Sequence, residues 1–143
     1  MIFSRFCHSS LLLPDGRVFI YGGYYYDEIF KISKYSYRAE FYNPDTNAFT
    51  SGPNMINNIM DGTGIGDNYA WFIDEEKQYL CIFTLSGVNL YDLKNDKIYA
   101  IDAIHYDYKT DKFIGTNTIT GFEDKALEKD LMEKMKKHPV FLC

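Results

Sequence analysis

The sequence predicts an all-β fold in which short antiparallel strands form four-stranded sheets, followed by one short α-helix near the C-terminal end. Three observations support this fold class. Residues 11–23 have the pattern of a β-hairpin, a motif of tyrosine, polar turn and apolar residue recurs along the chain, and a helical pattern appears only after residue 119. Hydrophobic residues make up 46% of the 143 residues and charged residues 24%, which is typical of a globular domain.

The first hairpin is the most specific pattern in the chain. Residues 11–13 are three leucines, a run that is too short for a helix and is typical of a strand buried on both faces. Asp15-Gly16 predicts a two-residue turn, and residues 18–21 are β-branched or aromatic, as expected for the second strand. Gly22-Gly23 ends this strand, since glycine permits a sharp bend or the close approach of another backbone.

A second pattern follows the hairpin and recurs along the chain. Residues 38–42 predict a third strand, residues 43–47 predict a turn, and Phe49 lies seven residues after Tyr42. The same order of tyrosine, polar turn and apolar residue occurs in residues 91–98 and 106–113. Since the first two copies begin about 50 residues apart, they indicate a repeated unit. The four strands expected in the second unit are residues 69–73, 79–84, 88–91 and 97–101.

Residues 5–23 and 38–49 together resemble one kelch repeat, which is the four-stranded blade of a β-propeller. The resemblance implies a kelch-like β domain at residues 1–118. Its expected parts are a first unit at 5–54, a degenerate second unit at 67–102 and an extra hairpin at 103–118. A full propeller has about four to eight blades, so this chain would form a partial propeller. Its open blade edges make self-association one expected property.

The resemblance also implies a function, which is a non-catalytic interaction module that presents blade loops to a protein or glycan partner. The long loop of the first unit is rich in tyrosine, and tyrosines offer a large contact area at little entropic cost. Loops held on a rigid scaffold are frequent binding surfaces. The candidate partner-binding residues are Tyr24, Tyr25, Tyr26, Tyr35 and Tyr37. Alternatively, these rings only cover the open edge of the blade.

Two further alternatives remain open. The first hairpin resembles galactose oxidase-like propellers, in which an arginine and a histidine precede a Leu-Leu-Pro-Asp-Gly-Arg-Val segment, as Arg5 and His8 do here. The copper enzymes of that group use a Tyr-His pair as ligands, but Cys7 stands at the tyrosine position. The alternative function is therefore a galactose oxidase-like copper enzyme fragment or an inactive relative of one, with His8 as its one candidate metal ligand. Under the main interpretation we expect no metal and no cofactor. The other alternative is a truncated propeller fragment without independent activity.

Charge and cysteine content narrow the range of partners. The net charge of −5 argues against nonspecific binding to nucleic acid or to a membrane surface. The chain has 3 cysteines without a C-x-x-C spacing, which indicates neither a disulfide framework nor a zinc site. Neither a signal peptide nor a membrane-spanning segment is evident, and we expect a cytoplasmic protein.

Residues 119–138 predict the C-terminal helix. Thr120 and Glu123 have the spacing of a capping box, which makes Thr120 the expected N-cap, and Pro139 stops the helix. We expect its apolar face to pack on the last hairpin or on another chain. The residues of this face are Phe122, Ala126, Leu127, Leu131 and Met135.

Overall fold

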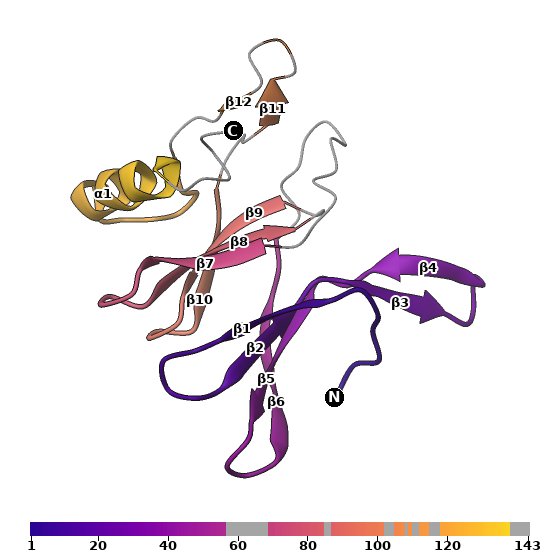
Figure 1. Cartoon of the computed structure of the whole chain (residues 1–143). Coiled ribbons are helices and arrows are strands. Elements are labelled where there is room, and N and C mark those ends of the chain that lie inside the picture. The colour runs from indigo at the N-terminus through magenta and orange to yellow at the C-terminus, as the bar shows by residue number, and fades with distance from the viewer. Residues whose placement is uncertain are drawn as a thin grey trace.

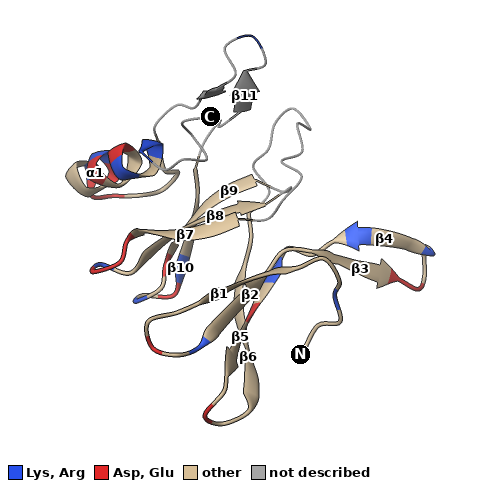
Figure 2. Ribbon diagram, viewed as in Figure 1, with Lys and Arg blue, Asp and Glu red and all other residues tan. Residues whose placement is uncertain are grey.

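The computed structural model describes residues 1–56, 69–84, 87–101, 105–107, 109, 112–114 and 118–137 (Figure 1). Within these ranges, the strands form two four-stranded and two two-stranded antiparallel sheets, and α1 (Lys125–Lys136) is the one α-helix. The predicted fold class is therefore confirmed. Figure 2 shows that charged residues gather at the turns and along α1, whereas the strands of the two larger sheets are mostly uncharged.

The first sheet has the strand order β1-β2-β5-β6. Its strands are β1 (Ser9–Leu12), β2 (Val18–Tyr21), β5 (Arg38–Asn43) and β6 (Ala48–Asn54). The first two strands form the predicted hairpin, but their connection is longer than the expected two-residue turn. Because Leu12 pairs with Val18, residues 13–17 make the connection. Gly16 has a φ of +86° there, and Asp15 does not share the positive φ that the predicted turn requires.

The three leucines before this turn do not form a strand buried on both faces, so that prediction is wrong. Leu12 is 68% exposed, Leu11 is half-buried, and only Leu13 is buried. The physical reason is that β1 lies at the edge of a sheet that packs on its neighbour through one face, which leaves alternate side chains in solvent.

The recurring tyrosine motif is a cross-strand pair beside a turn. Tyr42 lies opposite Phe49, with ring centroids 4.7 Å apart, and its hydroxyl donates a hydrogen bond to Asn47 Oδ1 at 3.0 Å. Tyr91 lies opposite Ile98 and donates to Asp96 in the same way. The spacing in the sequence thus reports a register in which two side chains pack across the ladder.

The second sheet is a meander of order β10-β9-β8-β7, and its four strands lie close to the predicted ranges. They are β7 (Tyr69–Asp74), β8 (Tyr79–Thr84), β9 (Gly87–Asp92) and β10 (Lys97–Ala100). The third copy of the motif forms the small hairpin of β11 (His105–Asp107) and β12 (Lys112–Ile114), in which residue 106 pairs with residue 113.

The two larger sheets pack face to face through an inter-sheet cluster of apolar side chains. Leu80 and Ile82 of β8 meet Phe19 and Phe41 of the first sheet, and all four are buried. The buried Asn89 adds a polar link, because its side-chain amide pairs with the N–H and carbonyl of Ile56 at 2.8 and 3.1 Å. The cluster comprises Leu13, Phe19, Tyr21, Ala39, Phe41, Met55, Leu80, Ile82 and Tyr91.

The opposite face of the second sheet is covered by α1. Cys81 and Phe83 alternate with the inter-sheet residues of β8, and they contact Leu131 and Met135 of the helix. Burial raises the pKa of the Cys81 thiol. This helix-side cluster comprises Cys81, Phe83, Val88, Leu90, Ile101, Ile119, Phe122, Leu131, Met132 and Met135.

The helix starts later than the capping-box pattern predicts. Asp124 is the N-cap, and its carboxylate accepts the N–H of Leu127 at 3.0 Å. Thr120 instead lies beside the end of β10, where its N–H donates a hydrogen bond to the Ala100 carbonyl at 2.9 Å. The prediction of Thr120 as N-cap is therefore wrong, because this backbone bond holds the residue outside the helix. Pro139 lies outside the described residues.

An ion pair joins α1 to the second sheet and makes stability depend on pH. Asp74 Oδ2 lies 2.8 Å from Lys134 Nζ, and this hydrogen bond is the main reason why the pKa of Asp74 is lowered. A depressed carboxylate pKa stabilises the fold above the unfolded-state value of about 3.9, and the contribution is lost as pH falls through the folded pKa.

We therefore expect Asp74→Asn to lower the free energy of unfolding at pH 7 by a small amount that shrinks as the pH falls below about 4. Urea denaturation of both proteins across this pH range measures the difference. Glu76→Gln, at an exposed position of the same turn, is the control and should show no such trend. A difference that stays constant with pH would contradict the assignment.

Candidate functional site

The tyrosine-rich loop of the first unit is an additional β-hairpin, which the sequence did not predict. It consists of β3 (Tyr24–Asp27) and β4 (Ile32–Tyr35) and is inserted between β2 and β5. Figure 1 shows it projecting from the first sheet, with β3 on the side of the N-terminus. The inserted hairpin thus carries four of the five tyrosines that the sequence singles out.

Asp27 closes the inserted hairpin. Its carboxylate accepts the N–H groups of Ile29 and Phe30 at 2.9 and 3.0 Å and pairs with Lys34 Nζ at 2.7 Å. The pKa of Asp27 is lowered, first of all by the hydrogen bond from Lys34. The Lys34 ammonium also lies 4.1 Å from the centroid of the Phe30 ring. These contacts hold the turn in one conformation.

Gly23 lets the N-terminal segment, residues 1–6, begin a ladder with the inserted hairpin. A Cβ at position 23 would lie 2.6 Å from the Phe6 carbonyl oxygen, and φ there is +81°. The absence of a side chain permits Phe6 and Tyr24 to exchange two backbone hydrogen bonds of 2.9 Å. The glycine pair therefore ends the strand, as predicted, and also brings two backbones together.

A buried ion pair anchors the N-terminal segment to the first sheet. Arg5 Nη2 lies 2.9 Å from Glu40 Oε2, and both side chains are fully buried. Arg5 Nη1 also donates to the carbonyl oxygens of Gly22 and Arg38 at 3.1 and 2.6 Å. Glu40 Oε1 accepts the N–H groups of Ile2 and Phe3. Residues 2–5 are thereby held toward β5 rather than along β3.

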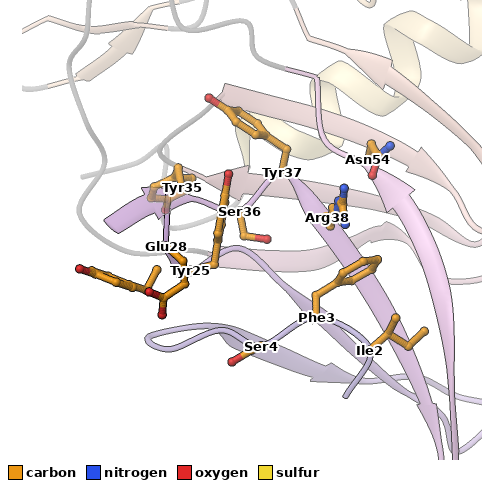
Figure 3. Close-up of a pocket in the computed structure, with 11 residues that line it drawn as sticks. Ile2, Phe3, Ser4, Tyr25, Glu28, Tyr35, Ser36, Tyr37, Arg38 and Asn54 are labelled. Atoms are coloured by element: carbon orange, nitrogen blue, oxygen red, sulfur yellow. The ribbon is translucent and has the colours of Figure 1, made fainter. Parts of the chain in front are cut away.

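A cavity of about 760 Å³ lies between the inserted hairpin, the N-terminal segment and the beginning of β5 (Figure 3). We call it the tyrosine cavity. Its volume is within the range typical of ligand sites, about 300–1,000 Å³. It is lined by Ile2, Phe3, Ser4, Tyr25, Tyr26, Glu28, Tyr35, Ser36, Tyr37, Arg38 and Asn54.

Four of the candidate residues, Tyr25, Tyr26, Tyr35 and Tyr37, line the tyrosine cavity. Tyr24 does not line it. The centroid of its ring lies 5.8 Å from that of Phe6 and 4.8 Å from that of Tyr35, so it packs against a ring that lines the cavity. Sequence reasoning did not identify the contribution of the N-terminal segment, because the contacts that bring it here join residues far apart in the sequence, such as Arg5 with Gly22 and Phe3 with Glu40, which are 17 and 37 positions apart.

The cavity offers one acidic and one basic side chain among its aromatic rings. Glu28 lies beside Tyr25 and Tyr35 in Figure 3, and Arg38 lies near Phe3 and Asn54 on the other side. The Arg38 guanidinium stacks over the Phe3 ring at 4.4 Å from its centroid, which fixes its plane at the cavity wall. The site can therefore combine apolar contact with hydrogen bonding to either sign of charge.

His8, the candidate metal ligand, lies exposed just before β1 and does not line the cavity. No group of three or more His, Cys, Asp or Glu side chains that could hold a metal ion occurs among the residues that the structure describes. The described residues thus offer His8 no set of partner ligands.

Comparison with family models finds a match to part of the chain. Residues 5–56 match the family model of the Kelch motif, a segment that contains the whole first sheet and the inserted hairpin. The recognition of a kelch repeat is confirmed, and the antiparallel sheets are consistent with a partial kelch propeller. No curated protein matches the chain. In the described part of the chain, no helix has the length and apolar character needed to cross a membrane.

Proposed function

We propose that this chain, whose residues 5–56 form a kelch motif, is a non-catalytic binding module that takes a protein or glycan partner in the tyrosine cavity. The Kelch motif suggests a family of protein-interaction modules, and this supports a role in binding. The observation that carries the proposal is the convergence of Tyr25, Tyr26, Tyr35 and Tyr37 on one cavity of about 760 Å³.

Tyrosine side chains suit a binding site because the ring buries apolar area against a partner while the hydroxyl can still form hydrogen bonds. Tyr26 and Tyr37 are 50% and 42% exposed, so each has surface that a partner can cover. Tyrosine has two side-chain torsions, and immobilising it costs less entropy than immobilising a long polar side chain. The first sheet and the Arg5–Glu40 pair hold the surrounding backbone, which reduces the ordering that binding requires.

Truncation of Tyr37 tests this proposal. We expect Tyr37→Ala to reduce the affinity for a ligand that was selected on the wild-type chain. The expected reduction is about tenfold, equivalent to about 1.4 kcal/mol. Ligands are selected from a linear peptide library and a glycan array, and their dissociation constants are measured by fluorescence polarisation or calorimetry.

Tyr69→Ala is the matched control, because Tyr69 is 44% exposed on β7 and does not line the cavity. It should bind the same ligands as the wild type does. If Tyr37→Ala and Tyr35→Ala both retain full affinity while folded, the tyrosine cavity is not the binding site.

A further inference from the structure

Among the residues that the structure describes, the edge of β3 that faces away from β4 is paired at one position only. Phe6 and Tyr24 form an isolated antiparallel bridge, in which each N–H donates to the other residue's carbonyl at 2.9 Å. If this ladder continued, Ser4 would lie opposite Tyr26, since antiparallel partners move in opposite directions along the two chains. The N-terminal segment instead turns toward Glu40, which accepts the N–H groups of Ile2 and Phe3.

Because the N-terminal segment turns away, no residue of that segment pairs with the backbone of Tyr26. Along a strand, the N–H and carbonyl of successive residues point to opposite edges. Tyr24 points toward Phe6, while Gly23 points to the other side, where its carbonyl accepts the N–H of Ser36 at 2.8 Å. Tyr26 therefore presents its N–H and carbonyl on the same edge as Tyr24, away from β4.

No described residue outside the inserted hairpin forms a backbone or side-chain hydrogen bond with the Tyr26 backbone. The tyrosine cavity borders this strand, because its lining includes Tyr25 and Tyr26 of β3 together with Phe3 and Ser4 of the N-terminal segment. Figure 3 shows Phe3 and Ser4 across the cavity from Tyr25 and Glu28. A strand edge with an open donor and acceptor thus borders a cavity lined by aromatic rings.

We infer that the occupant of the tyrosine cavity is an extended polypeptide segment that pairs with β3 at Tyr26 and continues the ladder begun by Phe6. The inference rests on the proposed binding function and names its partner class. A peptide strand supplies a donor and an acceptor on one residue, which matches the pair that Tyr26 presents, and a sugar has no such repeat. Its alternate side chains contact the tyrosine rings on the two faces of the hairpin.

Amide exchange at the tyrosines tests this pairing directly. The probe is a linear peptide selected from a phage-displayed library on the wild-type chain and counter-selected on Tyr37→Ala. In protein labelled with ¹⁵N-tyrosine, the Tyr26 amide should exchange quickly in the free chain and slow by about tenfold or more when the peptide is saturating. The Tyr24 amide is the internal control, because its bond to Phe6 protects it in both states.

A second measurement removes the hydrogen bonds one at a time. N-methylation of alternate peptide residues should weaken binding by about fivefold or more at one parity of positions only. Tyr26→Pro removes the N–H on the protein side at an edge that proline tolerates, and it should weaken binding more than Tyr26→Ala does. If Tyr26→Pro does not fold, the N-methylated peptides still decide the question.

The outcomes separate this inference from the proposed function. Suppose that the peptide binds in a Tyr37-dependent way, but that it does not slow amide exchange at Tyr26 and that N-methylation does not weaken its binding. Strand pairing is then overturned, and the binding function remains. The same holds if the selection yields no peptide while a glycan binds the cavity. If neither peptide nor glycan binds, the inference and the proposed function both fail.

Discussion

Glu40→Ala is expected to lower the free energy of unfolding by about 3–5 kcal/mol, because it leaves the Arg5 guanidinium buried without its counter-charge. The two side chains are fully buried and their charged atoms lie 2.9 Å apart. Burial lowers the pKa of Arg5, and the attraction of Glu40 opposes this shift. The N–H groups of Ile2 and Phe3 lose their acceptor as well.

Urea denaturation at pH 7, followed by the fluorescence of Trp71, measures this loss. The chain has 1 tryptophan, and its ring lies 6.2 Å from the Phe83 ring, so its emission reports the packing of the second sheet. The double variant Arg5→Met/Glu40→Leu should recover much of the lost stability, since it leaves no unpaired charge. Glu28→Ala breaks an exposed pair with Lys31 and should change little. A loss below about 1 kcal/mol for Glu40→Ala would show that Arg5 finds water or another partner.

Leu131→Ala is expected to lower the free energy of unfolding by about 2–5 kcal/mol. Leu131 is fully buried in the helix-side cluster, which also includes side chains of β8 and β9. Alanine is the better helix former, so the substitution does not weaken the helix itself. The expected loss therefore comes from the apolar contacts removed and from the cavity that remains between α1 and the second sheet.

Thermal and urea denaturation of the variant measure this effect, with Leu127→Ala as the control. Leu127 belongs to the border of the same cluster and is only partly buried, so its truncation should cost less. Equal and small losses for the two variants would mean that α1 is not an integral part of the core.

The hairpins of the two larger sheets were predictable because their signals are local. Alternating apolar residues, turn residues and the pairing of Tyr42 with Phe49 all fall within one short stretch of sequence. The same holds for residues 79–84, where the structure places β8 at the predicted range. Apolar side chains on both faces of β8 are explained by the inter-sheet cluster on one side and α1 on the other.

The inserted hairpin escaped prediction because its turn has no glycine or proline. Lys31 adopts a φ of +56° there, which a lysine does not predict. Asp27 stabilises the turn through hydrogen bonds from backbone N–H groups to its carboxylate. The tyrosines were recognised as a group by composition, yet the N-terminal segment that completes their cavity is held by Arg5 and Glu40, which are 35 residues apart. Side-chain contacts over such separations leave no local pattern in a single sequence.

The position of α1 gives the molecule two unlike ends. The outer face of the second sheet is covered by α1, whereas the outer face of the first sheet is covered only in part, by the N-terminal segment over Glu40, and leaves Leu12 exposed at its edge. A head-to-tail contact between identical copies joins two different surfaces, so such a contact would place the helix-covered side of one copy against the first sheet of the next.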